Sequence, residues 1–258
     1  MPDKLIGITL PRRVAAISVA QRVSHELNSS HVGFEVGYHV RFDERCSEKT
    51  RIKYMTDGIL INEMMQDPLI SKYSVIMIDD IHERTINSDI VLALLKKIRN
   101  KRNDLKLIVS SATLDAEKIA NYFTNNDKKL LSNILYIEGR VHPVDIYYLS
   151  SPCKNYVVEC VKICWYIHLN KKEGDILVFL TGQEEIEIFL SILNQKYEIE
   201  KKKSNSIFKI LGLPLYAGLP MENQMAVFDK PPNKTSKIFP FFFYFQVTIL
   251  FNFSFKEK

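Results

Sequence analysis

Short apolar runs alternate along the chain with longer stretches in which apolar residues recur at helical spacing. The runs cover residues 73–79, 106–110, 134–137 and 175–180, and β-branched residues are frequent in them, as in strands buried on both faces of a sheet. The stretches with helical spacing cover residues 16–27, 91–98, 157–168 and 183–194. Strands that alternate with helices pair in parallel, because each helix returns the chain to the same end of the sheet. The pattern therefore predicts an α/β fold.

The composition is that of an ordinary globular protein. Of the 258 residues, 46% are hydrophobic and 25% are charged, with 9 Gly and 10 Pro, which excludes collagen, a coiled coil and a disordered chain. The four cysteines are too few and too irregularly spaced for a disulfide scaffold, and they favour a reducing, intracellular setting. A net charge of +5 permits a polyanionic partner without requiring one.

The chain changes character at residues 139–143, where Gly-Arg-Val-His-Pro is typical of a turn followed by an extended connection. We therefore expect a domain boundary at this point. The predicted domains cover residues 1–139 and 140–237, and they are followed by an atypical tail over residues 238–258.

The tail is defined by its phenylalanines, because 8 of the 15 Phe in the chain lie between Phe239 and Phe255. The apolar run 238–251 is shorter than the roughly 20 residues that a membrane-spanning helix needs. Its high β-propensity and low charge are typical of aggregation-prone strands. Composition leaves three interpretations of the segment open, namely a membrane segment, an aggregation-prone strand and sequence not selected to fold.

Polar residues gather directly after three of the predicted strands. They occupy residues 79–84 (Asp-Asp-Ile-His-Glu-Arg), 110–113 (Ser-Ser-Ala-Thr) and 181–185 (Thr-Gly-Gln-Glu-Glu). Ligands of open α/β sheets bind beyond the carboxyl ends of the strands, so these are the first candidates for a site. Paired aspartates such as Asp79 and Asp80 suit a hydrated Mg²⁺ beside substrate phosphates. Alternatively, the pair caps the helix that follows.

These segments belong to an ordered series. The series is made of residues 9–16 (Thr-Leu-Pro-Arg-Arg-Val-Ala-Ala), 37–43 (Gly-Tyr-His-Val-Arg-Phe-Asp), 56–58 (Thr-Asp-Gly), 76–89 (Ile-Met-Ile-Asp-Asp-Ile-His-Glu-Arg-Thr-Ile-Asn-Ser-Asp), 111–113 (Ser-Ala-Thr), 180–186 (Leu-Thr-Gly-Gln-Glu-Glu-Ile) and 214–220 (Pro-Leu-Tyr-Ala-Gly-Leu-Pro). In this order it resembles motif Ia, the hook turn, motifs Ib, II, III and IV, and the stretch after motif IV of the DEAH-box RNA helicases, which belong to superfamily 2.

The resemblance implies a fold and an activity. The fold is α/β, with two RecA-like parallel-sheet domains of the P-loop NTPase type, both of which we expect to be truncated. The activity is ATP-dependent unwinding of RNA, with ATP and Mg²⁺ as cofactors. The implied partners are single-stranded RNA bound without sequence preference and a spliceosomal or activator protein, with no membrane. The implied location is the nucleus, with the cytoplasm as the alternative.

The resemblance also implies residue roles. Asp79 would hold Mg²⁺ through water, Asp80 takes the position of the catalytic Glu, and His82 would connect the nucleotide site to Ser111 and Thr113 of motif III. The residues that would contact RNA are Thr9, Arg12, Arg13, Arg41, Thr56, Asp57, Gly58, Thr181 and Gly182. Arg side chains and helix N-termini suit a phosphate backbone, and such contacts carry no base code.

The chain departs from the family pattern at several points. Asp80 shortens the water-orienting acid by one methylene, Ile81 replaces a small Ala, and Leu10 stands where Gln is common. The chain contains no G-x-x-x-x-G-K-[ST] phosphate loop, and the pattern stops after Ile238, before motifs V and VI. Because the resemblance ends there, we interpret the Phe-rich tail as foreign sequence. We expect negligible ATP hydrolysis by residues 1–258 alone. Two other functions stay open, namely a non-catalytic RNA-binding or partner-binding protein of the same ancestry, and a DNA-directed or protein-directed member of the superfamily.

One cluster of possible metal ligands lies outside these motifs. Cys160, Cys164 and His168 recur every four residues and therefore span about 12 Å of helix, too far for three side chains to meet on one zinc ion. With Val157 and Trp165 they predict a packed helix face instead.

Overall fold

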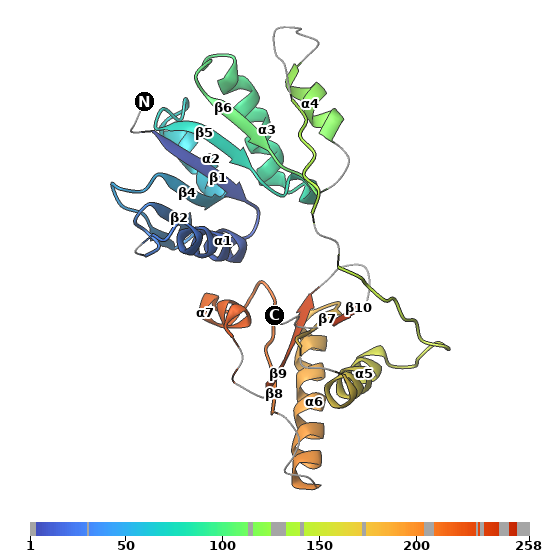
Figure 1. Ribbon diagram of the computed structural model, residues 1–258. Coiled ribbons are helices and arrows are strands. Elements are labelled where there is room, and N and C mark those ends of the chain that lie inside the picture. The colour runs from blue at the N-terminus through green and yellow to red at the C-terminus, as the bar shows by residue number, and fades with distance from the viewer. Residues whose placement is uncertain are drawn as a thin grey trace. The chain divides into compact units, whose positions relative to one another are not determined.

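The computed structural model of the chain divides into two compact units, Met1–Val141 and His142–Lys258 (Figure 1). The described residues are 4–29, 31–112, 116–124, 133–139, 142–171, 174–203, 209–230, 232, 235–242 and 248–251.

The first unit is built on a six-stranded sheet. In their order across the sheet, the strands are β3 (Asp43–Arg45), β2 (Val36–Val40), β4 (Ile52–Thr56), β1 (Leu5–Leu10), β5 (Tyr73–Ile78) and β6 (Lys106–Val109). Neighbouring strands are parallel except for β2 and β3, which form an antiparallel hairpin. The parallel pairing confirms the α/β prediction and brings the carboxyl ends of β1, β4, β5 and β6 to one edge.

Helices cover this sheet. They are α1 (Arg13–Glu26), α2 (Asp57–Gln66), α3 (Ile86–Arg99) and α4 (Ala116–Thr124), with a 3₁₀ turn at Ile81–Glu83. Helix α1 packs against β1, β2 and β4. Helices α2 and α3 share a separate core with β4 and β5, in which Met55, Ile76 and Ile78 are fully buried. Each such side chain contributes about 1.5–3 kcal/mol by leaving water.

The second unit has a four-stranded sheet. Its strands in order are β10 (Thr248–Phe251), β7 (Ile176–Leu180), β9 (Thr235–Phe242) and β8 (Lys209–Gly212), and only β10 is antiparallel to its neighbour. The helices are α5 (Tyr156–Asn170), α6 (Gln183–Lys203) and α7 (Met221–Met225), followed by a 3₁₀ turn at Ala226–Phe228. The two mostly parallel sheets confirm the fold class of RecA-like helicase domains.

The predicted helix face of Cys160, Cys164 and His168 is confirmed. All three side chains are buried, the two cysteines belong to the core between α5, α6 and the sheet, and His168 Nδ1 lies 2.9 Å from the hydroxyl of Ser236 on β9. Among the described residues, no group of three His, Cys, Asp or Glu side chains is arranged to hold a metal ion.

The prediction of a strand over residues 134–137 is wrong. This segment has no regular structure, and Leu135 and Ile137 are 85% and 92% exposed. Propensity alone does not make a strand, because the backbone groups of a strand need a paired edge. Among the described residues, both sheets are assembled without this segment.

The Phe-rich segment takes part in the second sheet. Strand β9 runs across position 238, where we expected the domain to end, and it lies between β7 and β8. Leu213 and Leu215 donate their amide protons to the carbonyls of Ile238 and Pro240 at 2.9 and 3.0 Å, which extends the pairing beyond β8. A segment that we interpreted as foreign therefore supplies a central strand.

Candidate functional site

Four strand ends meet at one edge of the first sheet. Thr9 lies beside Ile78 in the β1–β5 pairing, and Leu10 lies beside Thr56 in the β1–β4 pairing. The amide of Asp79 donates to the carbonyl of Thr9 at 2.9 Å, and the amide of Ser110 donates to the carbonyl of Ile78 at 2.8 Å. The segments that resemble motifs Ia, Ib, II and III are therefore neighbours.

Asp79 is fixed by the strands on both sides. Its oxygen Oδ1 accepts hydrogen bonds from the hydroxyl of Ser110 and from the amide of Asp80, the latter at 2.9 Å. The carboxylate is half-buried at the edge of the sheet. Hydrogen bonds to one oxygen orient a carboxylate and leave a second oxygen to serve a ligand.

Asp80 lies in a left-handed backbone conformation, with φ 53° and ψ 34°. Such a conformation is uncommon outside Gly, Asn and Asp and costs on the order of 1 kcal/mol. Burial, together with the negative charge of Asp79, raises the pKa of the Asp80 carboxyl. A carboxyl whose ionised form is disfavoured is better suited to exchange a proton than an exposed one.

The aspartate pair does not cap helix α3, which was the alternative explanation. The N-cap of α3 is Thr85, whose Oγ1 accepts the amide proton of Ser88 at 3.1 Å. Asp80 precedes the short 3₁₀ turn and makes no side-chain cap hydrogen bond. The two carboxyl groups therefore need another explanation than helix capping.

His82 follows the aspartate pair and approaches the segment after β6. The amide of Ala112 donates to Nδ1 of His82 at 3.4 Å, a long contact that requires Nδ1 to lack its proton. His82 and Ser111 line a cavity of about 570 Å³ beside α3 and α4. Thr113, the third predicted residue of this group, lies outside the described residues.

Arg12 and Arg13 stand at the start of α1. The guanidinium of Arg12 forms an ion pair with Glu83, with 3.0 Å between Nη2 and Oε1, so it joins the end of β1 to the loop after β5. The Nε atom of Arg13 is buried, and no described residue accepts its proton. Sequence reasoning missed Glu83 as the partner of Arg12, since nothing in the spacing relates positions 71 residues apart.

Thr9 and Asp57 form a buried polar pair at the same edge of the sheet. Their residues are 0% and 2% exposed, and neither the Thr9 hydroxyl nor the two Asp57 oxygens have a well-formed hydrogen bond among the described residues. Burial raises the pKa of Asp57, and the nearby Thr9 hydroxyl opposes this only in part. Burying a carboxylate without strong hydrogen-bond partners lowers the stability of the fold. Such a residue is typical of positions that are selected for function rather than for stability.

The backbone at the start of α2 is open. Thr56 is the N-cap in an extended conformation, and its side chain makes no cap hydrogen bond. A Cβ atom added to Gly58 would meet only the Asn87 side chain at 3.6 Å, an ordinary contact. The Thr56 side chain therefore does not occupy the N–H groups at this helix start, and helix N-termini of this kind suit an anion.

Arg41 lies at the tip of the β2–β3 hairpin. Val40 pairs with Asp43, so Arg41 and Phe42 form a two-residue turn in which Phe42 has a positive φ of 67°. Both side chains are exposed, and the Arg41 guanidinium lies 4.7 Å from the centre of the Phe42 ring. This places a cation and an aromatic face together on a rigid turn.

Thr181 and Gly182 occupy the end of β7 in the second unit. The amide and hydroxyl of Thr181 donate to Glu185 at 3.0 and 2.7 Å, and the hydroxyl of Tyr156 also donates to Glu185. Although burial opposes it, these hydrogen bonds lower the pKa of Glu185 overall. A Cβ atom at Gly182 would meet nothing within 4 Å.

Known proteins resemble this chain over most of its length. It is 47% identical over 242 residues to the human protein named probable ATP-dependent RNA helicase DHX35. The aligned region covers 91% of this chain and 34% of that protein. It is 44% identical over 237 residues to the Caenorhabditis elegans DHX35 homolog. It is 48% identical over 236 residues to the Schizosaccharomyces pombe pre-mRNA-splicing factor ATP-dependent RNA helicase prp22, covering 92% of this chain and 19% of that protein. No family model matches.

The chain is homologous to the DEAH-box ATP-dependent RNA helicases. It spans about a third of the length of the DHX35 relatives and a smaller share of prp22. The DEAH-box resemblance inferred from the motifs is thereby confirmed, together with the use of a nucleotide by these relatives. Among the described residues, no helix is both long and apolar enough to cross a bilayer.

Proposed function

We propose that this chain binds single-stranded RNA and a nucleoside triphosphate as a DEAH-box RNA helicase does. The observation that carries the proposal is the meeting of Thr9, Thr56, Asp79 and Ser110 at one sheet edge, in a homologue of ATP-dependent RNA helicases. In an open α/β sheet this edge is where ligands bind.

RNA would be held through its phosphates. Arg12, Arg13 and Arg41 provide cations, and the start of α2 at Thr56, Asp57 and Gly58 provides backbone N–H groups. The buried carboxylate of Asp57 would repel a phosphate, so Asp57 would support the start of α2 without contacting the phosphate. In the second unit, Thr181 and Gly182 contribute by the same chemistry. Contacts of this kind read no base sequence.

The nucleotide would be bound beside Asp79. Mg²⁺ typically takes one or two carboxylates and completes its shell with water and substrate phosphates. A single carboxylate oriented by Ser110 fits such a hydrated ion, which would neutralise charge on the phosphates when bound. Asp80 would orient the attacking water. His82 would connect the nucleotide site to Ser111 and Thr113.

RNA binding is tested by the anisotropy of a labelled single-stranded RNA of mixed sequence. With three arginines on phosphates, log Kd should rise with log salt with a slope of about 2. Arg12→Ala and Arg41→Ala should each weaken binding, whereas Lys101→Ala, which removes an exposed cation elsewhere in the unit, should not. Absence of binding at low salt, or equal effects of all three variants, would contradict the proposal. Stronger binding to DNA of the same sequence would favour a DNA-directed protein.

Hydrolysis is tested separately. We infer that turnover by this chain is slow, because the 258 residues contain no G-x-x-x-x-G-K-[ST] segment and Asp80 is one methylene shorter than Glu. RNA-stimulated ATPase assays should give a rate near background. RNA binding without turnover agrees with this inference and also with the second function, a non-catalytic RNA-binding protein, whereas turnover equal to that of an intact helicase would contradict both.

The named relatives suggest where the protein acts. One of them is a pre-mRNA-splicing factor, so we place this chain in the nucleus, on spliceosomal RNA or with a spliceosomal or activator protein. Crosslinking of the protein to RNA in cells, followed by sequencing, should recover intron-containing transcripts.

A further inference from the structure

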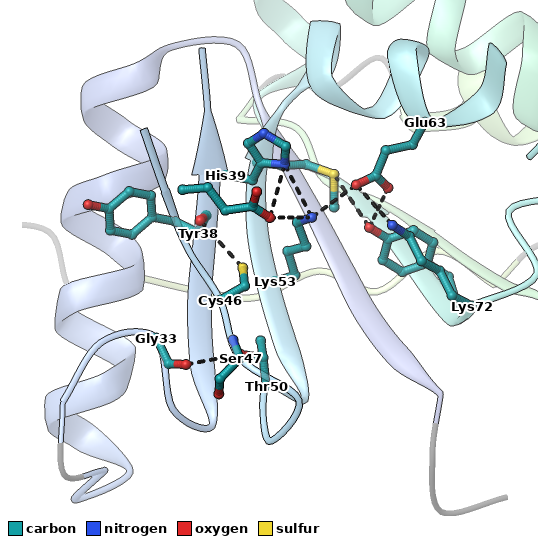
Figure 2. Close-up of polar contacts among 12 residues, drawn as sticks. Gly33, Tyr38, His39, Cys46, Ser47, Thr50, Lys53, Glu63 and Lys72 are labelled. Atoms are coloured by element: carbon teal, nitrogen blue, oxygen red, sulfur yellow. Dashed lines mark hydrogen bonds and ion pairs between the residues drawn. The ribbon is translucent and has the colours of Figure 1, made fainter. Parts of the chain in front are cut away.

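A buried lysine lies between two elements of the proposed RNA site. Lys53 is on β4 and is 5% exposed. Its ammonium nitrogen lies 2.9 Å from Glu63 Oε1, 3.3 Å from His39 Nδ1 and 3.4 Å from Glu44 Oε1. Figure 2 shows Lys53 between His39 on one side and Glu63 on the other. Two carboxylate oxygens and one imidazole nitrogen therefore surround the ammonium group.

Glu63 connects Lys53 to helix α2. The hydroxyl of Tyr73 donates to Glu63 at 2.6 Å, and Lys72 lies 3.1 Å from it. The Tyr73 ring reaches this position because Gly7 beneath it has no side chain, where a Cβ atom would approach the ring to 2.8 Å. Glu63 is thus held from three directions, and the helix that begins with Asp57 and Gly58 is fixed to β4 and β5.

His39 and Glu44 connect Lys53 to the β2–β3 hairpin. His39 is on β2 and Glu44 is opposite it on β3, and the next residues along the two strands lead to the turn that carries Arg41. Nδ1 of His39 lies 3.3 Å from Lys53 Nζ and 3.3 Å from Glu44 Oε1, so it can donate to the carboxylate when it carries a proton, and it accepts from the ammonium group only in a neutral ring. Burial, together with the charge of Lys53, lowers the pKa of His39 and favours that state.

The charges of the Lys53–Glu63 pair persist despite burial. Burial opposes the charge on each group, but the contact with Glu63 raises the pKa of Lys53 overall, and hydrogen bonds from Tyr73 and Lys53 lower the pKa of Glu63 overall. A buried ion pair is weak evidence for stability, because desolvation offsets its attraction and an apolar replacement is often as stable. What such a pair supplies best is a fixed geometry.

We propose that Lys53 is a positioning residue that sets the distance between Arg41 on the hairpin and the start of α2. A phosphate backbone bound at both points requires a fixed spacing between them, and Lys53 is bonded to both elements. The inference rests on the proposed RNA-binding function, because the spacing matters only if both elements contact RNA.

The primary test is the Lys53→Met variant of the full chain. Met keeps the length of the stem, and Glu63 retains Tyr73 and Lys72 as partners. We expect RNA affinity to fall between about 2-fold and 30-fold, the usual range for a residue that couples two elements. Lys106→Met, which removes an exposed lysine from β6 at the far end of the sheet, should leave affinity unchanged within the small effect of one surface charge.

A double-mutant cycle separates positioning from general loss of charge. If Lys53 holds Arg41 in place, Arg41→Ala should weaken RNA binding less in the Lys53→Met background than in the native chain. Equal effects of Arg41→Ala in both backgrounds would overturn the proposal. Glu44→Gln removes the negative charge from the contacts of the hairpin with Lys53 and His39 and should act in the same direction, which keeps the test available if Lys53→Met fails to fold.

Amide hydrogen exchange separates failure of this inference from failure of the proposed function. In Lys53→Met or Glu44→Gln, amides of residues 38–44 should exchange faster, while those of β5 and β6 should not change. If the hairpin amides exchange faster in these variants but the native chain binds no RNA, then Lys53 does connect the two elements and the proposed RNA-binding function is wrong. Unchanged exchange in the hairpin would reject the connection itself.

Discussion

The guanidinium of Arg12 and the carboxylate of Glu83 are joined by an ion pair of 3.0 Å between the ends of β1 and β5. A residue proposed to bind RNA is thereby in contact with the loop that carries Asp79 and Asp80. The Arg12 side chain is 58% exposed, so the pair contributes at most about 1 kcal/mol to stability. If RNA binds Arg12 as we propose, RNA and Glu83 compete for the same cation.

The first prediction follows from this competition. Glu83→Gln should strengthen RNA binding by roughly 2- to 5-fold, because Arg12 no longer has to leave an anionic partner. Arg12→Ala should weaken binding and lower the salt slope by about 0.7, and Glu83→Gln should then have no further effect. Anisotropy titrations of the single and double variants measure this. A Glu83→Gln effect that persists in the Arg12→Ala background would refute the competition.

The second prediction concerns the buried carboxyl of Asp57. Its raised pKa means that the folded chain binds a proton more readily than the unfolded chain, so ionised Asp57 lowers stability at neutral pH. Asp57→Asn should raise the free energy of unfolding by about 1 kcal/mol at pH 7. The gain should shrink as the pH falls through the raised folded pKa toward 3.8, where Asp57 in the folded chain is protonated.

Asp67 is the matched control for this measurement. Hydrogen bonds from the Ser71 hydroxyl and amide lower its pKa, so its ionised form stabilises the folded chain. Asp67→Asn should therefore be destabilising at neutral pH, with an effect that fades in acid below 3.8. Urea unfolding across this pH range measures both variants. The same sign for both would show that burial is not the cause at Asp57.

The third prediction concerns His39. Its lowered pKa means that the unfolded chain takes up this proton first, so stability should decrease as the pH falls through 6.5 and level off below the folded pKa. Lys53→Met removes a positive charge and should raise the pKa, although Glu44, Glu63 and Lys72 also act on the ring. The NMR titration of the His39 ring protons gives both values directly. If the titration midpoint of His39 is unchanged in Lys53→Met, then Lys53 and His39 do not lie in contact as described.

The fourth prediction compares two glycines. A Cβ atom at Gly37 would lie 2.5 Å from the Arg45 carbonyl oxygen and 2.8 Å from Cys46 Sγ, so Gly37→Ala should be destabilising by about 1–3 kcal/mol. Gly58→Ala meets no such obstacle and should stabilise α2 by roughly 0.5–1 kcal/mol. If phosphate approaches the α2 N-terminus closely, Gly58→Ala should nevertheless weaken RNA binding. Thermal unfolding and RNA titration of the same samples measure both effects.

Periodicity was sufficient for strands β5, β6 and β7, because buried strands such as 73–79 have a composition that surface segments lack. It did not identify β1, β2, β4 or β8. It failed for residues 134–137, whose composition is the same but whose backbone has no edge to pair with. It also could not find strand β9 within a run of Phe, because pairing depends on the neighbours β7 and β8 rather than on the segment itself.

The candidate site was predicted in part. Strand ends carrying Asp79 and Ser110 were recognisable, since polar residues directly after an apolar run are unusual. The Lys53 cluster was not, although a lysine between Ile52 and Tyr54 within a strand is a visible signal. Its partners Glu44 and Glu63 come from other elements, and only the folded sheet brings them within reach.

Strand β10, four residues long, covers the edge of β7 in the second sheet. Short edge strands open more easily than central ones, and an uncovered apolar edge recruits strands from other molecules. The practical lifetime of this protein in solution should then depend on detachment of Thr248–Phe251 rather than on global unfolding. Purification at low concentration, and storage away from conditions that loosen this strand, follow as handling rules.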